Sequence, residues 1–177
     1  MNINEDFLNK KATNNFYPWL NYPTIDFLQT FLTKESDVFE YGAGNSTLFF
    51  ATIVRQIFSI ESTAKWHDFV VESAKMHNLK NINITLCDNL QQFPDAISTF
   101  NTTFDLILID SRERARCLEM APDFLKPNGV ILLDNSEREN LQEQIAVTIN
   151  SGFTAKHLYG IGPNREYPSS AIAFCRK

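Results

Sequence analysis

The stretch VFEYGAGNSTLFFA, residues 38–51, decides the fold class. An apolar run that contains Glu40 meets two glycines, Gly42 and Gly44, and an Asn-Ser-Thr group then leads into a second apolar run at helical spacing. Glycine permits positive φ angles and a close approach of the backbone, and Ser or Thr is typical of the start of a helix. The stretch therefore predicts a strand, a tight turn and a helix, with a ligand held at the turn.

The rest of the chain repeats this alternation. We expect strands at 37–41, 56–60, 82–87, 104–110 and 130–134, helices at 23–32, 46–54, 63–78, 89–98, 115–125 and 143–150, and final strands at 153–159 and 169–175. Alternating strands and helices build a parallel sheet with helices on both faces. The last two strands have no helix between them, so we expect an antiparallel hairpin at one edge. The predicted fold class is α/β, with a Rossmann-like sheet.

Length and composition indicate one ordinary globular domain. The chain has 177 residues, of which 44% are hydrophobic and 21% charged, and we expect residues 1–22 to form an N-terminal arm or lid before a domain at 23–177. The net charge of −5 argues against a nucleic-acid partner. No signal peptide or membrane span is evident, and the three cysteines are far apart, which favours a cytoplasmic protein with reduced thiols. We expect a small-molecule substrate and leave a homodimer open.

Acidic residues end five of the predicted strands. They are Glu40, Glu61, Asp88, Asp110 and Asp134. Because the carboxyl ends of parallel strands meet at one edge of a sheet, where ligands bind, these residues predict a polar site there. Glu61 follows Gly42 by 19 residues, the place of an acid that accepts hydrogen bonds from both ribose hydroxyls of a nucleoside cofactor.

Two features separate the candidate cofactors. A dinucleotide fingerprint has a third small residue where this chain has Thr47. Glu40 lies two residues before the first glycine, and its carboxylate would repel a pyrophosphate but suits a cation. Both features favour S-adenosylmethionine, which carries a sulfonium and an α-amino group, over NAD.

These motifs resemble those of class I S-adenosylmethionine-dependent methyltransferases. VFEYGAGNST looks like their first motif, and FSIES, LCD, FDLILID and LKPNGVILLDN look like the motifs that follow. The resemblance covers residues 23–177 and implies a seven-stranded sheet with a C-terminal antiparallel hairpin. PWLNYPTIDFL, EYGAGNSTLFFA and LLDNSER are similar to a group of small bacterial methyltransferase-like proteins.

The resemblance also implies a set of cofactor-binding residues. The glycine turn would pass beside the amino-acid part of the cofactor, Glu61 would hold the ribose, and Asp88 with Asn89 would lie by the adenine. The full set is Glu40, Gly42, Gly44, Asn45, Ser46, Thr47, Glu61, Ser62, Asp88, Asn89 and Asp110. Trp66 either covers the adenine or belongs to the core of an amphipathic helix.

A metal site is one interpretation of Asp110, Asp134 and Asn135. Their oxygens are hard ligands that suit Mg²⁺ or Ca²⁺, and a bound cation would lower the pKa of an acceptor hydroxyl, which would make Asp110 and Asp134 catalytic. The two aspartates, 24 residues apart, resemble the metal site of catechol and caffeoyl-CoA O-methyltransferases, although the lysine of the catechol enzymes is replaced here by Arg112-Glu113-Arg114. Alternatively, Asp110 faces the methionine end of the cofactor, and Asp134-Asn135 caps the next helix.

The acceptor side of the site is less sharply predicted. An anionic or ring-bearing substrate could be held by Arg112, Arg114, Arg165 and Tyr167. Residues 160–169 should lie over the site. Arginines in loops, however, are usually only solvated. We expect methyl transfer from S-adenosylmethionine to a hydroxyl of a small molecule. The alternatives are a non-catalytic cofactor-binding or partner protein with the same fold and an NAD-type oxidoreductase.

Overall fold

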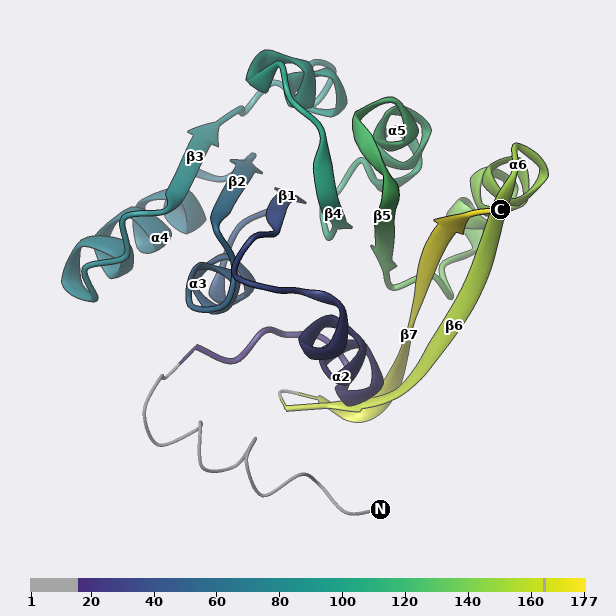
Figure 1. Ribbon diagram of the computed structural model, residues 1–177, viewed down its shortest axis with the longest axis horizontal. Coiled ribbons are helices and arrows are strands. Elements are labelled where there is room, and N and C mark those ends of the chain that lie inside the picture. Colours follow the sequence, from purple (N-terminus) through teal and green to yellow (C-terminus); the bar gives the residue numbers. More distant parts are fainter. Residues whose placement is uncertain (1–15, 164) are drawn as a thin grey trace.

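A seven-stranded mixed sheet forms the centre of the molecule (Figure 1). The computed structural model describes residues 16–163 and 165–177. The strands are β1 (Asp37–Tyr41), β2 (Gln56–Glu61), β3 (Ile82–Leu86), β4 (Phe104–Ile109), β5 (Leu125–Asp134), β6 (Phe153–Gly162) and β7 (Arg165–Arg176), in the order β3-β2-β1-β4-β5-β7-β6. β1 to β5 are parallel, and β7 runs antiparallel to both β5 and β6. The predicted α/β fold and the C-terminal hairpin are confirmed.

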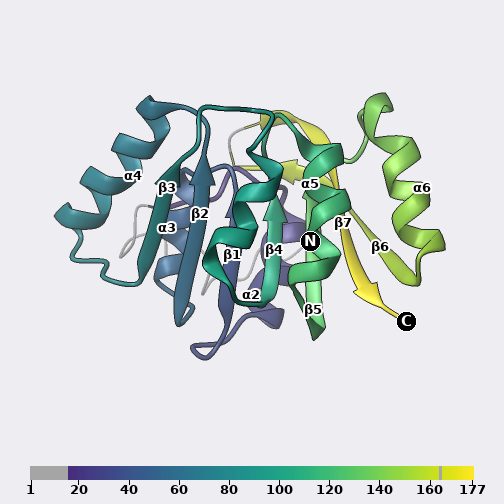
Figure 2. The same cartoon turned by 90° about the horizontal axis from the view of Figure 1, so that it is seen from above.

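Helices cover both faces of the sheet (Figures 1 and 2). One face carries α2 (Tyr22–Phe31), α3 (Asn45–Ala51) and α4 (Ala64–Met76), and the other carries the 3₁₀ helix η1 (Pro94–Phe100), α5 (Arg114–Met120) and α6 (Gln142–Asn150). Two short 3₁₀ turns, η2 (Ala121–Phe124) and η3 (Glu139–Leu141), precede β5 and α6. None of the helices in the described ranges is long and apolar enough to cross a membrane.

Side-chain alternation along the strands divides the core into two layers. Val38 packs with α2 and α3, whereas the next residue, Phe39, packs under η1 and α5. Leu106 and Ile107 on β4 alternate in the same way. Because successive side chains of a strand point to opposite faces and helices cover both faces, the central strands are almost continuously apolar.

The structure differs from the prediction where proline and turn residues occur. The helix expected at 89–98 is the 3₁₀ helix η1, which begins at Pro94. The helix expected at 115–125 ends at Met120, two residues before Pro122, because proline has no N–H to continue the helix. The strand expected at 130–134 begins earlier, at Leu125, so β5 includes the PNG segment at 127–129 beside a register shift between Phe104 and Leu106.

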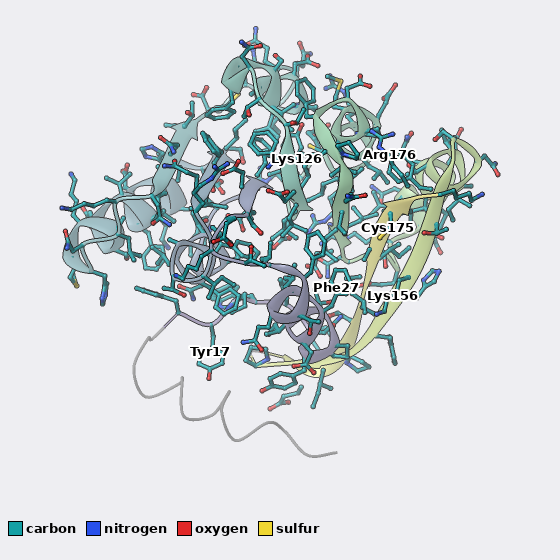
Figure 3. The ribbon with its side chains drawn as sticks, in the orientation of Figure 1. Tyr17, Phe27, Lys126, Lys156, Cys175 and Arg176 are labelled. Carbon is teal, nitrogen blue, oxygen red and sulfur yellow. The ribbon has the colours of Figure 1, made fainter. Side chains whose placement is uncertain are left out.

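The N-terminal segment, residues 16–21, is tied to the terminal hairpin. Asn21 caps α2 by accepting a hydrogen bond from the Thr24 N–H at 2.9 Å, and its amide donates to the carbonyls of Leu158 and Ser169. Figure 3 shows Lys156 of β6 against Phe27 of α2, with the ammonium 5.1 Å from the ring centroid. These contacts hold the segment and the hairpin together.

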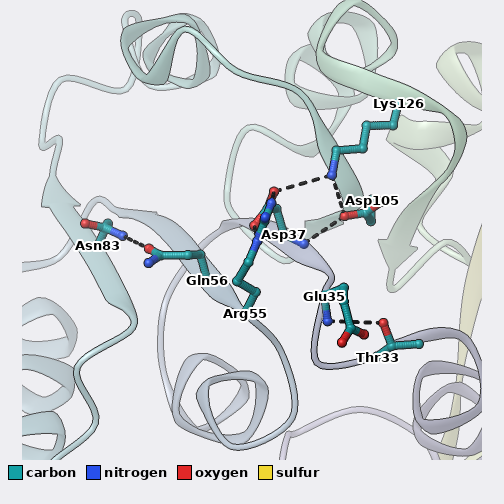
Figure 4. Close-up of polar contacts among 8 residues, drawn as sticks. All are labelled: Thr33, Glu35, Asp37, Arg55, Gln56, Asn83, Asp105 and Lys126. Atoms are coloured by element: carbon teal, nitrogen blue, oxygen red, sulfur yellow. Dashed lines mark hydrogen bonds and ion pairs between the residues drawn. The ribbon is translucent and has the colours of Figure 1, made fainter.

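A charged network joins β1, β4 and β5 at the edge of the sheet where β1 and β4 begin (Figure 4). Asp37 forms ion pairs with Arg55 and Lys126, and Lys126 also reaches Asp105 at 2.7 Å. The hydrogen bond from Arg55 holds the pKa of the Asp37 carboxyl below its usual value. This network is structural, since it lies at the edge opposite the carboxyl ends of the parallel strands.

Candidate functional site

A cavity of about 380 Å³ lies at the carboxyl ends of β1, β2, β4 and β5. The chain leaves β1 toward β2 on one side and returns to β4 on the other, so this is the topological switch point at which doubly wound sheets bind ligands. The cavity is lined by Trp19, Leu20, Gly42, Ala43, Gly44, Asn45, Ser46, Glu61, Ser62, Thr63, Trp66, Asp110, Ser111, Arg112, Arg114 and Arg138.

The two glycines of the first turn have different roles. A Cβ on Gly42 would lie 2.2 Å from the Asp110 carbonyl oxygen, and the φ of Gly42 is +94°. Gly42 therefore allows the β1 turn to pass against the end of β4. A Cβ on Gly44 would meet nothing closer than the Trp66 ring at 3.9 Å, so Gly44 is the glycine that leaves space on the ligand side.

Glu61 holds the glycine turn in place. One carboxylate oxygen accepts from the backbone N–H of Ala43 at 2.8 Å, and the other accepts from Thr63 N–H at 2.7 Å and weakly from the Ser62 hydroxyl at 3.4 Å. A carboxylate offers about four acceptor positions, so roughly one remains free on the Ala43 side. Glu61 thus has one acceptor position free for a ligand, and its role as the ribose acceptor stays a prediction.

Glu40 is buried beneath α3, outside the cavity lining. Its carboxylate accepts hydrogen bonds from the hydroxyls of Ser46, Thr47 and Ser59. Burial raises its pKa to about 8, and the charge of Asp110 contributes in the same direction. In this structure the Glu40 side chain is enclosed rather than presented to the cavity, and burial favours its protonated form, so its contact with a cofactor stays a prediction.

Ser46 and Thr47 likewise act mainly inside the fold. Both hydroxyls donate to Glu40, and the Thr47 oxygen also accepts from the Gly44 N–H at 3.0 Å. Thr47 is fully buried and does not line the cavity, whereas Ser46 does. The Thr47 side chain therefore supports the turn from within the fold, and its contact with a cofactor stays a prediction.

Arg114 connects the ends of β4 and β5. Its guanidinium forms an ion pair with Asp110 and donates to the Ser111 carbonyl, to the Asp134 carbonyl at 3.0 Å and to Asn135 Oδ1 at 3.0 Å. Arg114 is only 6% exposed. Burial lowers its pKa, while the charge of Asp110 opposes this change. The arginine side chain therefore fixes the carboxyl edge of both strands.

The Arg114 guanidinium contacts two of the three side chains that the sequence assigns to a metal ion. It already binds oxygens of Asp110 and Asn135, and no cluster of three or more His, Cys, Asp or Glu suited to a metal occurs at 16–163 or 165–177. Asp134 is 1% exposed and is not part of the cavity wall. The metal site of Asp110, Asp134 and Asn135 and the catalytic role of Asp134 stay predictions, and in this structure the Arg114 guanidinium is the positive charge beside Asp110 and Asn135.

The remaining predicted residues fall into three groups. Asn45, Ser62, Asp110 and Arg112 line the cavity. Asp88 and Asn89 are exposed and lie outside its lining, as does Tyr167, which is 66% exposed. The side chain of Arg165, like residues 1–15 of the predicted arm, lies outside what the structure describes.

Sequence reasoning missed part of the cavity wall. Arg138, which follows β5, lines the cavity and donates to Asn135 Oδ1 at 3.3 Å. Trp19 and Leu20 of the N-terminal segment also line it, and the Trp19 ring meets the Trp66 ring edge-on at 5.6 Å. Trp66 thus faces the cavity rather than the core. The aromatic residues at 16–22 are the sequence signal that could have identified this part of the wall, within the arm or lid predicted at 1–22.

The strand order and the place of the cavity define a class I methyltransferase fold. The family model of a methyltransferase domain matches residues 39–136, more than half of the chain. The chain therefore belongs to this methyltransferase-domain family. Comparison of the sequence with curated proteins finds no match.

Solved structures share the fold at low sequence identity. An O-methyltransferase from Bacillus cereus in complex with SAH has a TM-score of 0.72 and 18% identity, over 98% of this chain and 90% of that one. A precorrin-6y C5,15-methyltransferase from Geobacter metallireducens has a TM-score of 0.72 and 15% identity, over 88% and 87%. An rRNA methylase from Streptococcus thermophilus has a TM-score of 0.69 and 14% identity, over 86% and 93%.

These likenesses correct the prediction about partners. The acidic net charge led to the exclusion of nucleic acid and to the expectation of a small-molecule substrate. An rRNA methylase shares this fold over most of both chains, so the fold is compatible with a nucleic-acid substrate. The exclusion was wrong because net charge averages over the whole surface, whereas a partner meets only the local charge around a site.

Proposed function

We propose that this protein binds S-adenosylmethionine in the cavity and transfers its methyl group to a hydroxyl of an acceptor. The proposal rests on one observation in a chain of the methyltransferase-domain family. The Glu61 carboxylate is hydrogen-bonded to the glycine turn, beside the space that Gly44 leaves free. The O-methyltransferase with the same fold is a complex with SAH, which supports the choice of cofactor.

The residues of the cavity suit the parts of this cofactor. The free acceptor position on Glu61 would take a ribose hydroxyl, and the Trp66 ring offers an apolar face for the adenine. Asn45 and Ser46 would approach the amino-acid end, near the Asp110 carboxylate. Hydrogen-bond acceptors, an aromatic face and a glycine turn thus occur together.

The bound cofactor supplies an electrophilic methyl group on a sulfonium. An acceptor oxygen would form the new C–O bond as the C–S bond breaks, sulfur would keep the electron pair, and the hydroxyl proton would pass to the Asp110 carboxylate and from there to solvent. Asp110 lines the cavity, and its carboxylate is held by Arg114 but is partly exposed. It would accept the hydrogen bond of the acceptor hydroxyl and orient the oxygen for in-line attack.

Tryptophan fluorescence gives a direct test of the cofactor assignment. The chain has two tryptophans, and both line the cavity, so a bound ligand should change the emission. We expect S-adenosylhomocysteine to bind with micromolar affinity and NAD to bind at least 100-fold more weakly. Equal affinities for S-adenosylhomocysteine and NAD would contradict the proposal. So would the absence of a fluorescence change together with the absence of binding heat in calorimetry.

Turnover is a separate measurement from binding. Incubation with S-adenosylmethionine and candidate hydroxyl acceptors, with detection of S-adenosylhomocysteine as the product, tests methyl transfer itself. A protein that binds S-adenosylhomocysteine tightly and transfers no methyl group to any acceptor would favour the non-catalytic cofactor-binding alternative.

A further inference from the structure

The cavity has one end that is rich in arginine. Arg112 and Arg114 follow β4, and Arg138 follows β5, and all three line the cavity. The whole chain has a net charge of −5, so three guanidinium groups around one cavity are a local departure from the overall charge. Such a concentration of positive charge attracts anions.

Only one of these three arginines is neutralised by the protein. Arg114 is buried and paired with Asp110. Arg112 and Arg138 are exposed, and within residues 16–163 and 165–177 neither takes part in an ion pair. Two guanidinium groups at the cavity are therefore available to a ligand.

Arg138 lies close to a second positive charge. Its guanidinium and that of Arg114 donate to the same oxygen, Asn135 Oδ1, at 3.3 and 3.0 Å. The charge of Arg138 is among the causes that lower the pKa of Arg114. An anion at this end of the cavity would relieve the repulsion and give Arg138 a charged acceptor in place of a shared amide oxygen.

The opposite end of the cavity repels anions. Glu61 ends β2, and β1 and β4 separate β2 from β5, after which Arg138 follows. Three strand spacings put these ends roughly 14 Å apart. The charges therefore orient a ligand pair, with the ribose of the cofactor at the Glu61 end and an anionic group beside Arg112 and Arg138.

We propose that Arg112 and Arg138 bind a phosphate group of the methyl acceptor. This inference rests on the proposed methyl transfer, and it names the acceptor as phosphate-bearing. Guanidinium groups bind phosphate through two parallel N–H···O bonds, and Arg138 presents its group from the loop after β5, the strand that pairs with β4. The phosphate would hold the acceptor so that its hydroxyl lies near the Asp110 carboxylate.

The test compares phosphorylated and neutral probes on the full chain. Tryptophan fluorescence and calorimetry would measure binding of uridine 5′-monophosphate, uridine and a short RNA oligonucleotide, each with and without saturating S-adenosylhomocysteine. We expect the monophosphate to bind at least tenfold more tightly than uridine, with inorganic phosphate as a competitor. Whichever of uridine 5′-monophosphate and the RNA oligonucleotide binds with the higher affinity identifies the source of the phosphate.

Paired variants assign the effect to the two arginines. We expect R112Q/R138Q to weaken phosphate-dependent binding by at least tenfold and to change S-adenosylhomocysteine affinity by less than twofold. The control R116Q removes an exposed arginine that bonds to the Gln91 carbonyl outside the cavity and should leave phosphate binding unchanged. Thermal unfolding would verify that each variant is folded.

Two results would overturn the inference. One is equal affinity for uridine and its monophosphate with no binding of RNA, and the other is phosphate binding that R112Q/R138Q does not weaken relative to R116Q. Failure of the proposed function is distinguishable, since it would appear as a wild-type protein that does not bind S-adenosylhomocysteine.

Discussion

The Glu61 carboxylate accepts a hydrogen bond from the backbone N–H of Ala43 at 2.8 Å. The acid that ends β2 therefore fixes the turn that follows β1, so the ligand-facing loop and the predicted ribose acceptor form one unit. A side chain that is bound in this way loses little conformational freedom when a ligand arrives. The same bond means that a change at Glu61 affects both the shape of the turn and the contact with the cofactor.

Replacement of Glu61 by alanine should weaken S-adenosylhomocysteine binding by tenfold or more. The ribose loses a charged acceptor, which is worth about 1.5–3 kcal/mol, and the Ala43 and Thr63 N–H groups lose their partner. The thermal midpoint should fall as well. Fluorescence titration and thermal unfolding measure the two effects.

Glu119→Ala is the matched control for this prediction. Glu119 is an exposed residue of α5 outside the cavity, so its removal should leave both the affinity and the thermal midpoint unchanged. If Glu61→Ala binds S-adenosylhomocysteine as tightly as Glu119→Ala does, the ribose assignment fails.

The two glycines of the turn should respond differently to substitution. Gly42→Ala places a Cβ 2.2 Å from the Asp110 carbonyl oxygen at a φ of +94°, so we expect a loss of more than about 3 kcal/mol in the free energy of unfolding. The valine of Gly44→Val would not clash with the fold, but its side chain would project into the cavity. This variant should keep a near-normal thermal midpoint and bind S-adenosylhomocysteine at least tenfold more weakly.

Gly152→Ala separates backbone strain from steric clash. Gly152 also has a positive φ, of +101°, but a Cβ added to it would have no atom within 4 Å. Its replacement should cost about 1 kcal/mol. Equal destabilisation by Gly42→Ala and Gly152→Ala would show that contact with Asp110 is not the reason for Gly42.

The sequence predicts where the site lies better than it predicts which side chains face it. The bounds of β1 are correct because an apolar run stops at Gly42, and all five acids lie at or near the carboxyl ends of parallel strands. Yet Glu40 shares a face of β1 with Val38, and that face is covered by α3. The alternation of side chains along a strand could have predicted the orientation of Glu40. The hydrogen bond from Arg114 to Asn135 could not be predicted in this way, because it depends on β4 and β5 being neighbours in the sheet.

Glu40 should make stability depend on pH. Burial raises its pKa from 4.5 to about 8, so the folded state holds this proton more tightly than the unfolded state. The resulting stability is fully present below pH 4.5 and is lost as the pH rises through about 8. Glu40→Gln, which carries no such proton, should lack this contribution, so the wild type should lose stability relative to the variant between pH 5 and pH 9.

Thermal midpoints of the wild type and Glu40→Gln at pH 5, 7 and 9 test this sign. Glu119→Gln, a change of the same kind at an exposed position of α5, should follow the wild type at every pH. A wild type that gains stability relative to Glu40→Gln as the pH rises would show that Glu40 is ionised in the fold.

Loss of Arg114 should destabilise the carboxyl edge of β4 and β5. Arg114→Ala leaves the Asp110 carboxylate without its partner and removes donors from Asp134 and Asn135. Removal of one member of a buried ion pair costs about 3–5 kcal/mol, and we expect about 2–3 kcal/mol here because Asp110 is partly exposed. Arg116→Ala, an exposed change on the same helix, should cost less than about 0.5 kcal/mol.

Addition of Mg²⁺ or chelator should not change the thermal midpoint of the wild type, because the Arg114 guanidinium supplies the positive charge at this point. The metal hypothesis would be restored if Mg²⁺ raised the thermal midpoint of the wild type and Arg114→Ala did not lower it.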